Sequence, residues 1–255
     1  MTVQCELHGQ VAVLSLDDAA HFNALSAALV RELMQALHTL AEQDVRALVI
    51  TGRGRFFCAG ANIHDLHGGA WLSDQPDTHN PVTLFEALAS HRLPVIAAIN
   101  GPALGGGFEL ALSCDLAVMA NHAYLSTPEV GLGVIPNTAM ARLSSLIGWR
   151  RALEIMYTRR KVPASEALSL GVVNQVVAPE QVLAASLSLA QTIVEGAAPG
   201  ALAALKQGIN HHQRTDWNEV RACLARLPEA QWREGLSAFV EKRPPQYDEF
   251  WRQRQ

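Results

Sequence analysis

The chain has 255 residues, more than a small disulfide module needs and enough for one large domain or one domain with an appended region. Its 49% hydrophobic and 17% charged residues exclude a disordered or solvating segment. The formal net charge of −4 provides no general attraction for nucleic acid or for an acidic membrane surface. We therefore expect an ordinary globular protein with neither nucleic acid nor membrane among its partners.

The N-terminal segment and the cysteines indicate the compartment. Residues 1–16 alternate apolar and polar side chains and lack a basic stretch or a long apolar run, so they predict strands and not a signal peptide. No apolar run approaches the ~20 residues that a membrane span needs. Cys5, Cys58, Cys114 and Cys223 form no C-x-x-C pair and stand in apolar contexts typical of reduced core thiols. These features predict a soluble protein in a reducing, cytoplasmic setting.

The first half of the chain alternates strands and helices. Period-two patterns over 3–7 and 11–16 predict a hairpin, and a helical period over 26–41 precedes a strand at 47–50, which gives a ββα unit. The region 52–81 has no clear period and predicts a long surface excursion with short helices. The order strand, glycine loop, helix and strand then repeats over 94–99, 101–107, 108–112 and 116–119.

The second half becomes entirely helical beyond Pro179. Helices are predicted over 138–147 and 150–158 and from Ala164, followed by a strand over 172–177. The remaining predicted helices span 180–195, 199–212, 216–227 and 229–242. We place a boundary near 195, between a β/α core of residues 1–195 and a helical C-terminal region of residues 196–255.

The stretch Asn100–Leu112, NGPALGGGFELAL, holds three consecutive glycines at a predicted helix start. Glycine costs up to ~1 kcal/mol relative to alanine in a helix, so these residues indicate a close approach to the backbone. Free N–H groups at such a point bind a phosphate or a developing oxyanion. No Lys-Ser/Thr follows the glycines and no G-x-G-x-x-G is present, which argues against a nucleotide. The structural alternative is a tight turn that lets strand and helix pack closely.

Two glutamates are candidates for acid/base chemistry. Glu109 falls in the first turn of the predicted helix, where it could also simply stabilise the helix dipole. Glu129 stands in an otherwise uncharged apolar segment, which favours a raised pKa, although a cap is an equal alternative. Two carboxyl groups beside backbone donors suffice to add water across a polarised double bond, because one deprotonates water and the other protonates carbon.

Other site types find little support. The segment Ala59-Gly60-Ala61 is a weak second candidate for a backbone donor. His64 and His67 lack a third ligand, and the adjacent His211 and His212 diverge on a helix, so we predict no metal. No Ser/His/Asp or Cys/His nucleophile set can be assembled, and Cys58 is better explained as a packed thiol.

Five motifs in chain order resemble those of the crotonase (enoyl-CoA hydratase/isomerase) superfamily. They are FNAL at 22–25, FCAGANI at 57–63, LGGGFELA at 104–111, Pro128-Glu129, and EGLSAFVEKR at 234–243. The resemblance covers nearly the whole chain. It implies an α/β fold, a spiral of ββα units with a helical C-terminal region for trimerisation, and a homotrimer or a hexamer made of two trimers. It also implies an acyl-coenzyme A thioester as substrate, with no separate cofactor.

The resemblance also assigns roles to residues. It implies that the backbone N–H groups of Ala61 and Gly106 form an oxyanion hole, with Glu109 and Glu129 as the acid/base pair. The other implied contacts with coenzyme A or the acyl group are Ala59, Ile63, Asn137, Phe239 and Lys242, the last two from a neighbouring subunit. Having both glutamates resembles the hydratases, lyases of fatty acid metabolism that add water reversibly and syn to a trans-2-enoyl-CoA. The alternatives are another crotonase-type reaction, isomerisation or decarboxylation, or a non-catalytic acyl-CoA-binding scaffold.

The chain departs from the family pattern at three places. After Pro136 it has Asn137-Thr-Ala-Met140 where the family commonly has glycines, so we expect added bulk beside the reacting carbons, with the N–H of Asn137 still able to donate to water. Before Asn23 only His21 is available for a phosphate. Asn62 replaces an acid and is expected only to shape its loop. We further expect the irregular region 64–82 to wall the acyl pocket.

Overall fold

The computed structural model describes residues 2–41, 43–67, 71, 80–213, 215–248 and 250. A six-stranded sheet in the order β1-β2-β3-β4-β6-β9 forms its centre, with β1 antiparallel to β2 and every other neighbouring pair parallel. Its strands are β1 (Val3–His8), β2 (Val11–Leu16), β3 (Ala47–Gly52), β4 (Val95–Ile99), β6 (Leu116–Ala120) and β9 (Gln175–Val177). The fold is therefore mixed α/β, as the sequence predicts.

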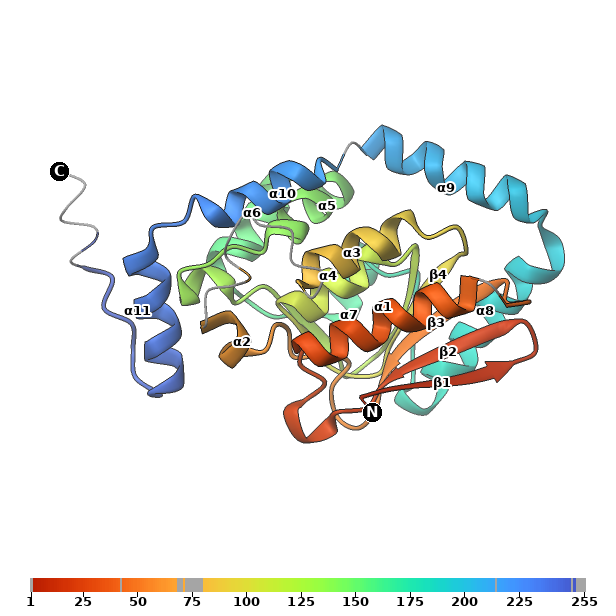
Figure 1. Ribbon diagram of the computed structural model, residues 1–255, viewed down its shortest axis with the longest axis horizontal. Helices are drawn as coiled ribbons and strands as arrows, with labels where there is room; N and C mark the ends of the chain where they lie inside the picture. The colour runs from red at the N-terminus through yellow and green to blue at the C-terminus, as the bar shows by residue number, and fades with distance from the viewer. Residues whose placement is uncertain are drawn as a thin grey trace.

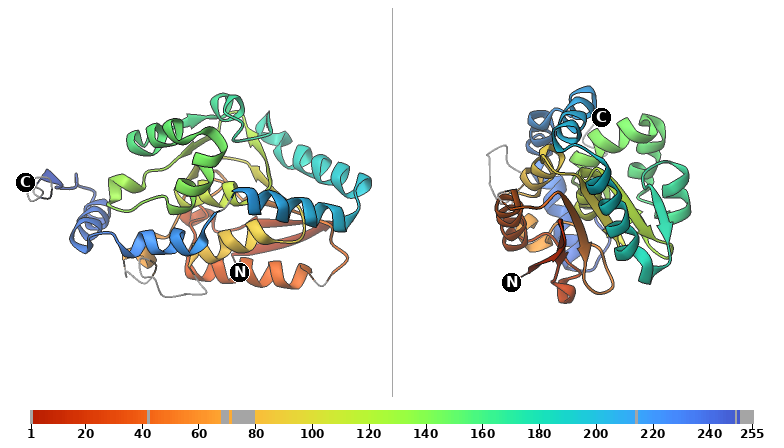
Figure 2. Two further views of the ribbon diagram at one scale, coloured as in Figure 1. Left: turned by 90° about the horizontal axis from the view of Figure 1, so that it is seen from above. Right: turned by 90° about the vertical axis from the view of Figure 1, so that its right-hand side faces the viewer.

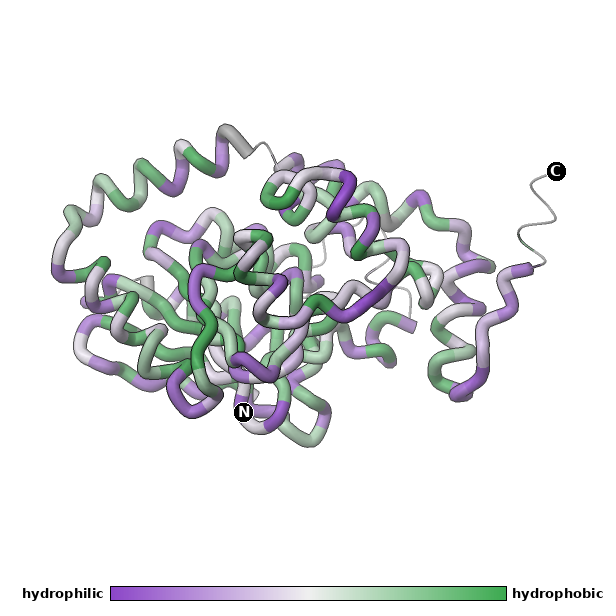
Figure 3. The backbone as a smooth tube through the Cα atoms, turned by 180° about the vertical axis from the view of Figure 1, so that it is seen from behind, coloured by the Kyte–Doolittle hydropathy of each residue, from purple (hydrophilic) through white to green (hydrophobic). Residues whose placement is uncertain are grey.

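Helices cover both faces of this sheet, which explains why β2, β3 and β4 consist entirely of buried residues. Helix α1 (Ala27–Ala41) packs on β1 and β2, and α8 (Val182–Gly196) packs on β3, β4 and β6. The two helices lie on opposite sides of the sheet (Figure 2). Hydrophobic segments accordingly gather along the central strands, whereas the outer helices alternate hydrophobic and hydrophilic residues (Figure 3).

A second, three-stranded sheet was not predicted from the sequence. It joins β5 (Ala103–Leu104), β7 (Tyr124–Ser126) and β8 (Val162–Pro163), with β5 parallel to β7 and β7 antiparallel to β8. These strands are too short to show a period, and their pairing is non-local. The sheet holds the glycine stretch in place, because β5 ends at Leu104, directly before Gly105.

The remaining elements before the C-terminal helices are the 3-10 helices η1 (Ala19–His21), η3 (Glu129–Leu132) and η4 (Pro179–Gln181), and the helices α2 (Ile63–His67), α3 (Pro81–Ser90), α4 (Gly106–Ser113), α5 (Asn137–Ile147), α6 (Trp149–Thr158) and α7 (Ala164–Ser169). Among them, α5, α6 and α7 follow the predicted order closely, whereas α3 and the 3-10 helices were not predicted individually. Helix α4 begins two residues before the predicted start, so two glycines lie within its first turn. The predicted strand over 172–177 is too long, because the N–H groups of Val172 and Val173 bond the carbonyl of Ala167.

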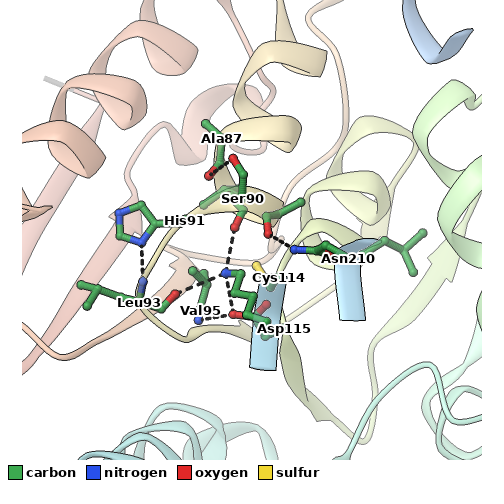
Figure 4. Close-up of polar contacts among 12 residues, drawn as sticks. Ala87, Ser90, His91, Leu93, Val95, Cys114, Asp115 and Asn210 are labelled. Atoms are coloured by element: carbon green, nitrogen blue, oxygen red, sulfur yellow. Dashed lines mark hydrogen bonds and ion pairs between the residues drawn. The ribbon is translucent and has the colours of Figure 1, made fainter. Parts of the chain in front are cut away.

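Three C-terminal helices run one after another along the whole length of the molecule (Figure 1). They are α9 (Pro199–Gln213), α10 (Trp217–Ala225) and α11 (Glu229–Val240). Helix α9 is tied to the core by Lys206, whose Nζ donates to the carbonyls of Leu88 and Leu93 and lies 2.8 Å from Asp115 Oδ2. Asn210 donates to the carbonyl of Ala89 nearby (Figure 4). Helix α10 packs against α5 and α3, and α11 against η3 and α2.

The environments of the four cysteines differ in part from the prediction. Cys58 and Cys114 are buried, but Cys5 is exposed and Cys223 is half-buried, so the prediction of four core thiols is wrong for those two. Cys5 lies on the edge strand β1, whose residues from Cys5 to His8 are exposed.

Among the described residues, no single helix has the length and apolarity of a membrane span. The segments Pro179–Gly196 and Pro199–His211 reach that length only when taken together, and the chain bends by 114° between them.

Candidate active site

One pocket brings most of the predicted site residues together. It has a volume of about 100 Å³ and lies between the 59–63 loop, α3, the start of α4, η3 and the start of α5. Its lining includes the predicted residues Ala59, Ala61, Ile63, Gly106, Glu109, Glu129 and Asn137. Phe239 and Lys242 lie at the end of α11 and immediately after it, outside this lining, and Phe239 is 55% exposed.

Glycine is required at each of the three consecutive positions 105–107 for a different physical reason. Gly105 adopts φ +53°, and a Cβ there would lie 2.8 Å from Glu129 Oε1. A Cβ on Gly107 would lie 2.2 Å from the carbonyl oxygen of Cys58, so this residue permits close packing of backbone on backbone. A Cβ on Gly106 would stand 3.3 Å from the backbone nitrogen of Ala61. The close-packing alternative therefore holds for Gly107, whereas Gly105 and Gly106 keep space open in the pocket.

Gly106 and Ala61, whose backbone N–H groups are the predicted oxyanion donors, both line this pocket. Within the described part of the chain, neither N–H donates to a protein acceptor. Gly106 opens α4, and the first N–H groups of a helix have no partner inside it. Ala61 is held by Leu25, whose N–H donates to the carbonyl of Gly60 at 2.7 Å and whose carbonyl accepts from Asn62 at 2.9 Å. Two unused donors thus lie in one pocket wall.

Glu109 is buried, and hydrogen bonds from the N-terminus of α5 hold its carboxyl group in place. Its Oε1 accepts from the backbone N–H groups of Thr138 at 2.7 Å and Ala139 at 2.9 Å, at the N-terminus of α5. Burial raises the pKa of Glu109 to about 7, although these two hydrogen bonds favour the charged form and oppose the shift. The carboxyl group therefore complements the dipole of α5. The alternative prediction was that Glu109 would stabilise the dipole of its own helix, α4.

Glu129 is buried without the helix N–H contacts that Glu109 has. Neither of its carboxyl oxygens has a hydrogen-bond partner among the described residues, and its side chain does not cap η3. Burial raises the pKa of Glu129 well above its ordinary value, and the nearby Glu109 raises it further. Of the two states in which one glutamate is ionised, an anionic Glu109 beside a protonated Glu129 leaves less unpaired buried charge.

The structure contradicts one expectation about the 137–140 segment and part of another. The backbone N–H of Asn137 donates to the carbonyl of Ile135 at 3.0 Å, so it does not point to water in the pocket. The Asn137 side chain donates instead to the carbonyl of Val220 in α10 at 3.0 Å. Asn137 lines the pocket as expected, whereas Met140 is 36% exposed and does not belong to the lining, so it adds no bulk there.

The far wall of the pocket was only partly anticipated. Trp71 and Asn80 fall within the predicted region 64–82, whereas residues 68–70 and 72–79 lie outside the described residues. Val82 and Phe85 from α3 complete the wall; Val82 also falls within the predicted region, whereas Phe85 was not predicted. Asn62 accepts from the N–H of His64 at 2.9 Å and so shapes its loop as expected. In the described residues, no three His, Cys, Asp or Glu side chains are grouped as metal ligands.

Comparison with known proteins agrees with this geometry. The family model described as enoyl-CoA hydratase/isomerase matches residues 6–252. The chain belongs to the enoyl-CoA hydratase/isomerase family. It is 33% identical over 249 residues to the short-chain-enoyl-CoA hydratase of Clostridium acetobutylicum, covering 93% of this chain and 94% of that protein.

Solved structures of the family extend the comparison to the fold. The structure of an enoyl-CoA hydratase from Bacillus anthracis is 31% identical, with a TM-score of 0.75 over 97% of this chain and 99% of that one. A methylmalonyl-CoA decarboxylase complexed with 2S-carboxypropyl-CoA is 28% identical, with a TM-score of 0.85 over 96% of this chain and 97% of that one. The fold is therefore that of the crotonase superfamily, and the protein is an enzyme of this family, with which an acyl-CoA substrate is consistent.

Proposed function

We propose that this enzyme adds water reversibly to the double bond of a trans-2-enoyl-CoA. The observation that supports the proposal most strongly is Glu129, a buried carboxyl group without a partner, in the same pocket as Glu109 and two unused backbone donors. A carboxyl group kept neutral by its surroundings is a proton donor at neutral pH. Its neighbour, held as a carboxylate by two helix N–H groups, is a proton acceptor.

The proposed reaction assigns one task to each group. Glu109 takes a proton from water while the water oxygen bonds to the β-carbon of the enoyl group. The π electrons move toward the thioester oxygen, and the N–H groups of Ala61 and Gly106 stabilise the developing enolate. Glu129 then gives its proton to the α-carbon. The proton gained by Glu109 restores Glu129 before the next turnover, since the two carboxyl groups titrate as a pair.

The runner-up reaction is decarboxylation, favoured by the structural likeness to a methylmalonyl-CoA decarboxylase. A substrate for that reaction brings its own carboxylate into the pocket. Two further carboxyl groups line this one, and like charges in a poorly solvated site repel each other strongly. The pocket therefore suits a neutral acyl group better. A double-bond isomerase needs only one of the two glutamates, and a scaffold needs neither.

The size of the pocket favours a short acyl chain. Cavities of about 150 Å³ hold a molecule the size of benzene, and this one measures about 100 Å³ with mostly apolar walls. The name of the Clostridium acetobutylicum relative, a short-chain-enoyl-CoA hydratase, agrees with a short acyl group. We further propose a cytoplasmic trimer or hexamer that needs no separate cofactor, with Ala59 near the adenine and Phe239 and Lys242 contacting coenzyme A bound to a neighbouring subunit.

A product assay tests the proposal. Purified enzyme is incubated separately with trans-2-enoyl-CoAs of increasing chain length and with methylmalonyl-CoA, and the products are identified by mass. We expect the enoyl thioesters to gain one water, with the shortest reacting fastest, and methylmalonyl-CoA to remain intact. Loss of carbon dioxide from methylmalonyl-CoA without hydration of any enoyl-CoA would replace the hydratase by the decarboxylase.

A further inference from the structure

We propose that Asn137 is a positioning residue that links helix α10 to the carboxylate of Glu109, so that the C-terminal region sets the geometry of the acid/base pair within its own subunit. The kinetic part of this inference rests on the proposed hydratase function. The structural part rests on hydrogen bonds alone.

The N-terminus of α5 determines where the Glu109 carboxylate lies. Thr138 and Ala139 donate their backbone N–H groups to Glu109 Oε1, at 2.7 and 2.9 Å. The N–H groups on either side of them, those of Asn137 and Met140, donate to carbonyl oxygens of the preceding loop at 3.0 and 2.7 Å. Every N–H of this turn already has an acceptor, and that of Thr138 has two, so a shift of the turn moves the carboxylate or breaks its hydrogen bonds.

The amide of Asn137 connects this turn to α10. The side chain is buried, with 4% of its surface exposed. Its Oδ1 accepts from the N–H of Thr138 at 3.0 Å, the same N–H that donates to Glu109. Its Nδ2 donates to the backbone carbonyl of Val220 in α10 at 3.0 Å. A single buried side chain thus bonds both the helix turn that holds Glu109 and a helix 83 positions further along the chain.

A second contact fixes α10 on the other side of the pocket. Arg221, the residue after Val220, forms an ion pair with Glu86 of α3. Val82 and Phe85 of the same helix line the pocket. Helix α10 is therefore held to one wall through Arg221 and to the Glu109 anchor through Asn137.

The test compares the wild-type enzyme with Asn137→Leu, which has nearly the same size and shape but cannot form these hydrogen bonds. We expect kcat to fall by about 10-fold or more while KM changes by less than about 2-fold, because a misplaced catalytic group affects the chemical step. The helix N–H bonds favour the charged form of Glu109, so loosening them moves the acidic limb of the pH profile to higher pH, by roughly half a unit or more. An Asn137→Leu enzyme with wild-type kcat and pH profile would overturn the proposal.

Hydrogen exchange provides a readout that does not depend on turnover. In Asn137→Leu we expect the amides of Thr138 and Ala139 to exchange at least several-fold faster than in the wild type, relative to the amides of the α5 interior. Arg221→Ala, which loosens α10 without changing the pocket lining, should produce the same change and serves if Asn137→Leu does not fold. Unchanged exchange in the variant that folds refutes the link. If the wild type hydrates no enoyl-CoA, the proposed function fails, and the exchange data still decide the link.

Discussion

Glu129 places a carboxyl group where ionisation is costly, and Glu109 places another where two helix N–H groups support a charge. This difference predicts a bell-shaped dependence of kcat/KM on pH. Activity should rise as Glu109 loses its proton, with a midpoint at about pH 7, because burial raises its pKa to about 7. It should fall at higher pH as Glu129 loses the proton it donates. Initial hydration rates over pH 5 to 10 measure both limbs, and a flat profile would contradict the pair.

The raised pKa of Glu129 also predicts a pH-dependent effect on stability. The folded protein keeps a proton that the unfolded chain releases at its ordinary pKa, about 4.3. The stability that comes from the protonated form is therefore present below that pH and is lost as pH rises through the folded-state pKa. Glu129→Gln removes this loss. The difference in melting temperature between the variant and the wild type should therefore shift in favour of the variant as pH rises from 5 to 9. Exposed Glu180→Gln is the control, and an equal gain there would refute the explanation.

At the scale of elements, the first two residues of α4 are glycines with different roles: Gly106 is proposed to serve catalysis, whereas Gly107 permits close packing. Gly106→Ala places a methyl group 3.3 Å from the Ala61 nitrogen, in the space proposed for the thioester oxygen, and alanine suits a helix. We expect turnover to fall about 100-fold or more, with nearly wild-type stability. In Gly107→Ala the methyl group meets the Cys58 carbonyl at 2.2 Å, so we expect clear destabilisation. Turnover and thermal melts of both variants test this, and an active Gly106→Ala enzyme would refute the oxyanion hole.

The sequence predicts regular elements well and non-local ones poorly. Strands such as Ala47–Gly52 and the amphipathic helix Ala27–Ala41 follow from local periodicity, since their residues are buried on both faces or on one. The small sheet of β5, β7 and β8 has strands of two or three residues, and pairing across long separations leaves no local pattern. Individual site residues could be proposed from motifs, but the capping of α5 by Glu109 and the link from Asn137 to Val220 depend on tertiary contacts.

At the scale of the whole molecule, α11 leaves apolar surface uncovered at the end of the chain. Phe239 is 55% exposed, and we propose that it and Lys242 contact coenzyme A bound to a neighbouring subunit. Light scattering should therefore give a mass three or six times that of the 27.6 kDa chain. Phe239→Ser should raise KM for the acyl-CoA several-fold with kcat retained, whereas Leu168→Ser, 44% exposed on α7, should change neither. A monomer with full activity would contradict this assignment.

The central claim is that both glutamates act together in hydration. The most direct measurement is the loss of absorbance of the conjugated thioester when a short trans-2-enoyl-CoA is mixed with wild type, Glu109→Gln or Glu129→Gln, with acyl-CoA binding measured in parallel. We predict that the wild type consumes the double bond and that each variant binds the thioester but reacts at least about 100-fold more slowly. A wild-type rate in either variant would contradict the claim.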